Sequence, residues 1–427
     1  MALMRRRLPL SLFLFLSSAL SAAPVDDLPD HVLRKGMPNV FSKLQKGGDV
    51  SIAYFGGSIT AQPGYRVKTF QWLQKEYPQT KLTEINAAIG GTGSDLGVFR
   101  NGQDVLAHKP DLVFVEFAVN DSGAPPDQIH RCMEGIVRQT WRANPSTDIC
   151  FVYTIANNMI DEWKDGTLPR SVVAMEQLAE HYGIPSIHFG REIAKLAAAD
   201  RLVRAAPLPK TDTERAALGN KVVFAPDNVH PHVETGHQIY FEAAAKALTA
   251  MKAMGQPFEH ALISPLVADH LEAAKLVPFS RAQKSPGWKT LPSDHKLAKS
   301  FSKRLPEIWH SNQPGETVEF SFKGTSVGLY DLVGPDCGQL AVTLDGVKAP
   351  KPTARFDSYC AYHRLASFFP SRNLPDALHT VKIEILPDQP DKAAILSQRK
   401  QVIDDPKRFD DRQWYVGGIM LVGDLIE

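Results

Sequence analysis

The chain has 427 residues, and its 48 lysines and arginines balance 47 aspartates and glutamates, for a formal net charge of +1. A balanced composition gives no electrostatic sign of a nucleic-acid or anionic-membrane partner, and it fits a neutral substrate or polymer better. The length exceeds what one compact core usually supports and indicates two domains. The oligomeric state stays open.

The N-terminal segment has the pattern of a secretory signal peptide. Three consecutive arginines precede an apolar run at residues 8–16, and small residues follow it. The run is too short to span a bilayer, and no cysteine follows it to take a lipid. Residues 1–23 are therefore predicted to be removed, with cleavage near Ala22, which would leave a secreted or periplasmic protein without a transmembrane segment.

The first strand of the next segment ends in a candidate nucleophile. A β-forming run at residues 51–55 ends at two glycines, and Ser58 follows them. A turn at this point would place the serine hydroxyl at the edge of a sheet, where it is accessible. A serine hydroxyl is weakly nucleophilic at neutral pH, so it needs a base and donors for the oxyanion. Far downstream, a loop that follows Pro226 offers Asp227 and His230, a carboxylate and an imidazole three residues apart.

Two further strands lead into polar loops. A strand at about residues 81–87 enters a glycine-rich stretch that includes Gly91. Its glycine spacing does not fit a dinucleotide-binding loop, and it has no lysine where a phosphate-binding loop needs one. The nearly continuous apolar run at residues 112–117 is typical of a strand buried on both faces of a parallel sheet, and it delivers Asn120.

In this order, the segments resemble the SGNH (GDSL-like) hydrolases, which carry serine, glycine, asparagine and histidine in separate sequence blocks. The matching blocks are residues 57–58, 86–91, 119–121 and 227–230. The chain departs from the common pattern at Gly57, where the family often has aspartate, and at Ala118, where it often has glycine. These departures affect the choice of subfamily more than the chemistry.

The resemblance implies a catalytic mechanism. Ser58 would attack an acyl carbonyl, with His230 as general base and Asp227 fixing its tautomer. The backbone N–H groups of Ser58 and Gly91 and the side-chain amide of Asn120 would hold the oxyanion. Such a mechanism requires no metal and no organic cofactor.

Three more residues are candidate substrate contacts. Tyr65 and Arg66 lie soon after the nucleophile in sequence, where a plain surface loop is an equal alternative. Arg100 is either a substrate contact or an anchor for a loop, and the anchor is favoured.

The histidines near the C-terminal block allow a second interpretation. His230, His232 and His237 have a spacing that can bind zinc, with a carboxylate nearby in Asp227. The resemblance instead assigns Asp227 and His230 to proton transfer and leaves the other two histidines as loop or helix residues.

Helices and strands alternate along residues 24–256. A helix at residues 170–182, for example, ends at Gly183 and precedes a short strand. This alternation predicts a parallel sheet covered by helices on both faces, with the active loops at the carboxyl ends of the strands. The resemblance implies the same fold, a flavodoxin-like three-layer α/β/α SGNH hydrolase domain.

The alternation stops at residues 257–290, which prolines punctuate and which we predict to be a linker. Short β-like runs separated by turn signals fill residues 291–427 and indicate an all-β sandwich (jelly-roll-like) domain.

The role of this second domain has two equal alternatives. Similar-looking modules accompany carbohydrate esterases of the SGNH group, so the resemblance points to glycan binding, and the alternative is structural support for the first domain. Five aromatic residues are candidates for stacking on sugar rings, although most aromatics in a sandwich are core: Trp288, Trp309, Tyr330, Tyr359 and Tyr362.

The four cysteines are too few for a disulfide scaffold. Cys132 lies on an apolar helical stripe and Cys150 begins a buried strand, so both are predicted to be core thiols. Cys337 and Cys360 share the second domain, and a bond between them stays open.

The leading hypothesis is a secreted serine esterase that removes short acyl groups, above all acetyl, from carbohydrate. One alternative is a lipase or thioesterase with the same site, although no long apolar loop that could form a lid lies near the blocks. A second alternative is an enzyme that transfers the acyl group to a sugar. A third is a glycan-binding protein with a degenerate hydrolase fold, but the complete set of site residues argues against it. An α/β-hydrolase is disfavoured because Thr60 takes the last position of the Gly-x-Ser-x-Gly elbow.

Overall fold

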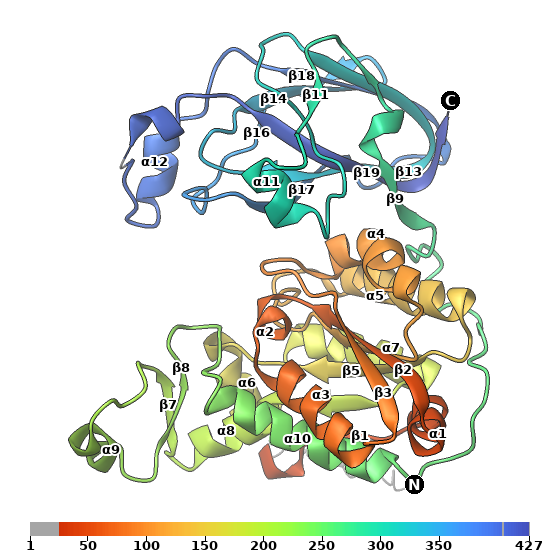
Figure 1. The fold of residues 1–427 in the computed structure, drawn as a ribbon, viewed down its shortest axis with the longest axis vertical. Coiled ribbons are helices and arrows are strands. Elements are labelled where there is room, and N and C mark those ends of the chain that lie inside the picture. The colour runs from red at the N-terminus through yellow and green to blue at the C-terminus, as the bar shows by residue number, and fades with distance from the viewer. Residues whose placement is uncertain (1–24, 404, 427) are drawn as a thin grey trace, which may run out of the picture.

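The computed structural model describes residues 25–403 and 405–426, which form two domains stacked end to end (Figure 1). The predicted signal peptide, residues 1–23, lies outside the described residues. In the described part of the chain, no helix is long and apolar enough to cross a membrane.

A six-stranded sheet of order β1-β6-β5-β4-β2-β3 forms the centre of the first domain. Its five parallel strands are β2 (Gly48–Gly56), β3 (Thr80–Asn86), β4 (Leu112–Glu116), β5 (Asp148–Tyr153) and β6 (Ser186–His188). The short edge strand β1 (His31–Val32) is antiparallel to β6. Every residue of β4 and β5 is buried, which explains why the sequences of these strands are nearly continuous apolar runs.

Helices cover both faces of this sheet, as the sequence predicted (Figure 1). On one side, α4 (Ser94–Asp104), α5 (Pro126–Ala143) and α7 (Arg170–Tyr182) pack against one another. On the other, α10 (Gly236–Met251) packs against α3 (Tyr65–Glu76) and α8 (Gly190–Ala198). Helix α7 ends at Gly183, whose φ of +71° is the left-handed conformation expected of a glycine C-cap.

A small two-stranded parallel sheet projects from the first domain. It pairs β7 (Leu202–Ala205) with β8 (Val222–Ala225), and α9 (Asp212–Leu218) lies between them in the chain. Strand β8 ends two residues before Asp227. This projection therefore leads directly into the loop that carries the predicted acid and base.

The second domain is an antiparallel β structure of eleven strands, which confirms the all-β prediction. Its two longest strands, β13 (Thr317–Val333) and β19 (Trp414–Ile426), pair along most of their length. Strands β18 (Ala377–Ile385) and β14 (Gln339–Leu344) extend the sheet beside β13, and β17 (Arg364–Ser371) pairs with the second half of β13.

The segment predicted to be a linker, residues 257–290, is partly built into this sheet. Strand β9 (Ala274–Pro278) pairs with β19, β10 (Gln283–Lys284) with β13, and β11 (Lys289–Thr290) with β12 (Trp309–Ser311). The second domain therefore begins earlier in the chain than the prediction placed it. These strands are short and flanked by prolines, so the sequence shows no strand pattern there.

All four cysteines are free and buried. The core position predicted for Cys132 and Cys150 is confirmed. The structure contains no disulfide between Cys337 and Cys360.

The two domains contact each other closely through α4. Phe99 of α4 lies 5.5 Å, ring centre to ring centre, from Phe369 of β17. Gln103 donates a hydrogen bond of 2.8 Å to the carbonyl of Arg304, and Arg372 makes a 2.8 Å ion pair with Asp95. Helix α4 begins just after Gly91, so the second domain packs against the helix that follows the predicted oxyanion loop.

Candidate active site

Ser58 stands at the carboxyl end of β2, where it begins the short helix α2 (Ser58–Ala61). The preceding Gly57 is required by close packing, because a Cβ there would lie 1.9 Å from Oδ1 of Asn120. Glycine at this position, a departure from the common family pattern, therefore lets the Asn120 side chain lie against the backbone next to Ser58.

Asp227, His230 and Ser58 form a continuous hydrogen-bonded chain. Oδ2 of Asp227 lies 2.9 Å from Nδ1 of His230, and Nε2 of His230 lies 2.9 Å from Oγ of Ser58. With Nδ1–H donating to the carboxylate, Nε2 accepts from the serine hydroxyl, which is the tautomer a general base needs.

The Asp227 carboxylate is held in its ionised form. Partial burial acts to raise its pKa, but hydrogen bonds from the backbone and ring of His230 and from the backbone of Val229 outweigh burial and lower the pKa. The two backbone N–H groups donate to Oδ1, each at 2.7 Å. Oδ2 is therefore left to orient the imidazole.

Sequence reasoning missed Asn157, which anchors this loop. Its backbone N–H donates to the carbonyl of Asn228 at 2.9 Å, and its side chain donates to the carbonyl of Asp227 at 3.4 Å. Asn157 follows β5 at the same edge of the sheet as Ser58. Its place after a parallel strand was the signal that could have identified it.

The predicted oxyanion donors lie in loops around Ser58. Gly91 is exposed and has a φ of +73°, and a Cβ on the adjacent Gly90 would lie 3.5 Å from Cβ of Ser58. Asn120 lies against Gly57 on another side, in the turn that follows β4. The loops that follow β3 and β4, the two strands on either side of β2, therefore both lie close to the backbone around Ser58.

The three candidate substrate contacts lie in the protein interior. Tyr65 is 2% exposed and its hydroxyl is 2.7 Å from Oγ1 of Thr60. Arg66 is buried and pairs with Glu84 while donating to the carbonyl of Thr60.

Arg100 is fully buried, pairs with Asp104 at 3.0 Å and donates to the carbonyls of Ala87 and Gly56. Gly56 is the last residue of β2, and Ala87 directly follows the adjacent strand β3. This placement of Arg100 fits the anchor role that the sequence favoured. For Tyr65 and Arg66, a supporting role fits their burial better than the substrate contact considered from the sequence.

A buried polar network lies beneath the nucleophile. Glu116, the last residue of β4, accepts from Thr60 at 2.9 Å and from Thr154 at 2.6 Å. Burial raises the pKa of Glu116, although hydrogen bonds from Thr154 and Thr60 oppose that effect. Sequence reasoning did not assign Glu116, and an acidic residue inside an apolar strand was the available signal.

The remaining histidines have protein partners. His237 accepts from the backbone N–H of Tyr65 at 3.1 Å and lies 3.0 Å from Oε1 of Gln62, and burial lowers its pKa to about 4. His232 donates through Nε2 to the carbonyl of Ala206 at 2.9 Å. Among the described residues, no group of histidine, cysteine and carboxylate side chains could hold a metal ion.

Asp121, next to Asn120, contacts the end of the loop that contains Gly91. Its Oδ1 accepts the backbone N–H of Ser94 at 3.0 Å, and a Cβ on Gly93 would lie 2.2 Å from the same oxygen. Burial raises the pKa of Asp121 to about 7 and outweighs the hydrogen bonds from Ser94, which lower it. Asp121 therefore connects the two loops that carry Asn120 and Gly91.

We expect Asp121→Asn to change stability in a pH-dependent way. Since the folded-state pKa lies above the unfolded value, the folded protein loses stability relative to the unfolded chain as pH rises from about 4 to 7. The amide keeps the acceptor for Ser94 and does not ionise. The difference in melting temperature, variant minus wild type, should therefore be more positive at pH 8 than at pH 4, as differential scanning calorimetry can measure. A pH-independent difference would contradict a raised pKa at this site.

A cavity of about 250 Å³ lies between the two domains, beside the predicted oxyanion loop. Gly91 and Asp95 line it on the hydrolase side, and the charged side chains of Arg355, Asp357 and Arg364 line it on the β-domain side. Polar side chains from a second domain thus lie next to the loop that contains Gly91.

The chain is similar to known proteins in sequence over part of the first domain and in fold over both domains. Residues 54–239 match the model of the GDSL-like Lipase/Acylhydrolase family. A two-domain esterase active on acetylated mannans, co-crystallised with mannopentaose, is 18% identical with a TM-score of 0.70, over 93% of this chain and 98% of that one. A second structure described as a two-domain esterase active on acetylated mannans gives the same identity and TM-score over 92% and 98%. No match to the chain was found among curated proteins.

Proposed function

We propose that this chain, whose residues 54–239 match the model of the GDSL-like Lipase/Acylhydrolase family, is a secreted serine esterase that removes O-acetyl groups from carbohydrate. The observation that carries the proposal is the hydrogen-bonded chain from Asp227 through His230 to Ser58. Secretion rests on the signal-peptide pattern of residues 1–23.

The proposed reaction uses Ser58 as nucleophile and His230 as proton carrier. Oγ of Ser58 attacks the acetyl carbonyl while its proton passes to Nε2 of His230, and Asp227 stabilises the resulting imidazolium. The backbone N–H groups of Ser58 and Gly91 and the amide of Asn120 stabilise the oxyanion. When the intermediate collapses, His230 returns the proton to the departing sugar oxygen and an acetyl-serine remains.

Water completes the cycle by the same steps. His230 takes a proton from a water molecule, which attacks the acetyl-serine, and Ser58 leaves with that proton as acetate is released. The residues named in these steps supply every proton transfer, so the proposed reaction needs no cofactor.

Carbohydrate is favoured over a lipid by the surroundings of the site. The cavity beside Gly91 is lined by charged side chains from both domains, which suit the hydroxyl groups of a sugar better than a long alkyl chain. The two-domain likeness that extends over 93% of this chain is to an esterase active on acetylated mannans, and it supports the same substrate class.

The test compares acyl chain lengths and glycans. We expect p-nitrophenyl acetate to be hydrolysed faster than the butyrate ester, and the octanoate ester slowest of all. We also expect acetate release from acetylated mannan or another acetylated polysaccharide, measured enzymatically. Octanoate turned over faster than acetate would favour a lipase or thioesterase and contradict the proposal.

A further inference from the structure

A second pocket, of about 550 Å³, opens on the β domain and is lined only by residues of that domain. Helix α11 (Lys296–Phe301) forms one wall, with Ser300 among its lining residues. Asp336, Tyr362 and His363 line another part. We call this cavity the α11 pocket, and it contains none of the residues assigned to the reaction.

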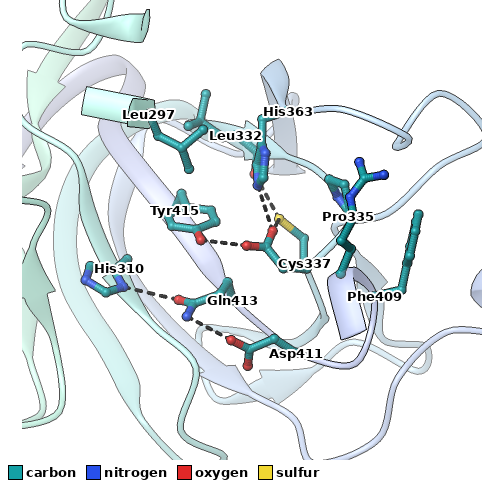
Figure 2. Close-up of polar contacts among 12 residues, drawn as sticks. Leu297, His310, Leu332, Pro335, Cys337, His363, Phe409, Asp411, Gln413 and Tyr415 are labelled. Atoms are coloured by element: carbon teal, nitrogen blue, oxygen red, sulfur yellow. Dashed lines mark hydrogen bonds and ion pairs between the residues drawn. The ribbon is translucent and has the colours of Figure 1, made fainter. Parts of the chain in front are cut away.

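A fixed polar network forms part of the α11 pocket (Figure 2). Asp336 lies 2.7 Å from Nε2 of His363 through one carboxylate oxygen and accepts from the Tyr415 hydroxyl at 2.8 Å through the other. Burial acts to raise the pKa of Asp336, but the hydrogen bonds from His363 and Tyr415 outweigh burial and lower the pKa. The ionised carboxylate therefore fixes the tautomer in which Nε2 of His363 carries a proton.

This tautomer leaves Nδ1 of His363 as an acceptor without a hydrogen-bond partner in the described chain. The ring lies tightly against Gly334, where a Cβ would be 2.3 Å from Cδ2 of His363. Orientation by Asp336 and close approach to Gly334 therefore hold the imidazole rigidly at the pocket. A preorganised acceptor of this kind can bind a ligand hydroxyl at little entropic cost.

The α11 pocket also has an exposed aromatic residue in its lining, Tyr362. The side chain of Tyr362 is 59% exposed, whereas Trp288 and Tyr330, two of the aromatics considered from the sequence, are buried. An aromatic face beside a rigid hydrogen-bonding group suits a pyranose ring, which presents C–H groups on its faces and hydroxyls at its edge.

The charges around the α11 pocket favour a neutral ligand. Its cationic side chains, Lys296, Lys407 and Arg408, nearly balance the carboxylates of Asp336 and Asp411. The Asp411 carboxylate already accepts from side-chain amides, at 3.0 Å each from Asn312 and Gln413. No strong field of one sign therefore selects a charged sugar.

We propose that the α11 pocket binds a pyranose unit of a neutral polysaccharide and so holds the polymer on the β domain while esters are hydrolysed at Ser58. The class of ligand rests on the proposed function. The assignment of the pocket as a binding site depends on Tyr362, His363 and Asp336.

The test measures binding of an unacetylated polymer to the full chain carrying Ser58→Ala. Affinity gel electrophoresis with soluble mannan and xylan gives the dissociation constant, and Tyr362→Ala and His363→Ala are added in turn. Tyr359→Ala is the matched control, because this tyrosine lies in the same loop and is 45% exposed but does not line the α11 pocket. We expect at least tenfold weaker binding with Tyr362→Ala or His363→Ala and unchanged binding with Tyr359→Ala.

Two results would overturn the proposal. One is equal binding by the Tyr362→Ala and Tyr359→Ala variants, and the other is a preference for a uronic-acid polymer over both neutral ones. Hydrolysis of p-nitrophenyl acetate by Tyr362→Ala with Ser58 intact should be unchanged, which shows that the variant is folded. Binding that depends on Tyr362 without any esterase activity would contradict the proposed function alone, and activity without such binding would contradict this inference alone.

Discussion

Ser58→Ala should abolish ester hydrolysis while leaving the fold intact. The substitution removes the hydroxyl proposed to form the acyl-enzyme, and it takes away the hydroxyl that lies 2.9 Å from Nε2 of His230. Losses of a triad nucleophile reach at least about 10⁴-fold in kcat, because only binding and oxyanion stabilisation remain. The measurement is kcat for p-nitrophenyl acetate, with melting temperature as the check on folding.

A matched control comes from the same strand. Ser51 lies in the first half of β2, away from the carboxyl end of the strand where Ser58 stands, and Ser51→Ala should keep nearly full activity. If Ser58→Ala retained more than about a hundredth of wild-type kcat, the nucleophile assignment would be wrong. The ester would then be attacked directly by water or by the side chain of another residue.

The sequence predicted the hydrolase fold well because that fold has strong local patterns. Buried parallel strands such as β4 and β5 are apolar except for one acidic residue at an end of each, Glu116 and Asp148. Helix ends carry clear signals such as Pro126 in α5 and Gly183 after α7. The strand ends, in turn, indicated where Ser58, Gly91 and Asn120 would meet.

The β domain was harder to predict because its strands are defined by pairing across long sequence distances. Strand β13 is continuous over 17 residues and changes register against β19. Strand β17 contains a proline and is half-buried at every residue, so it lacks the alternation of buried and exposed residues that identifies a strand. Neither feature leaves a periodic pattern in the sequence.

At the site too, contacts between residues close in sequence could be predicted, and contacts that depend on several elements could not. Asp227 and His230 lie three residues apart, so their pairing could be inferred locally, and the structure has it at 2.9 Å. Burial of Arg100 under the ends of two strands depends on packing from several elements, and a charged residue in sequence is as compatible with a surface role. Asn157 and Glu116 were missed for the same reason.

Asn120→Ala is the second change with a large expected effect. We predict a fall in kcat of about 10²–10³-fold with little change in KM, because an oxyanion donor acts mainly on the charge that develops in the transition state. The substitution leaves a gap beside Gly57, where the amide now packs, so a small loss of stability should accompany it. Steady-state kinetics with p-nitrophenyl acetate separate the two parameters.

Asn120→Asp distinguishes donation from packing. The carboxylate fills the same space beside Gly57 but donates no hydrogen bond and places a negative charge where the oxyanion forms. If Asn120 acts as a donor, this variant should lose at least as much kcat as Asn120→Ala despite its better fit. Recovery of activity in Asn120→Asp would mean that the side chain only fills space, and the oxyanion hole would then consist of the Ser58 and Gly91 backbone groups alone.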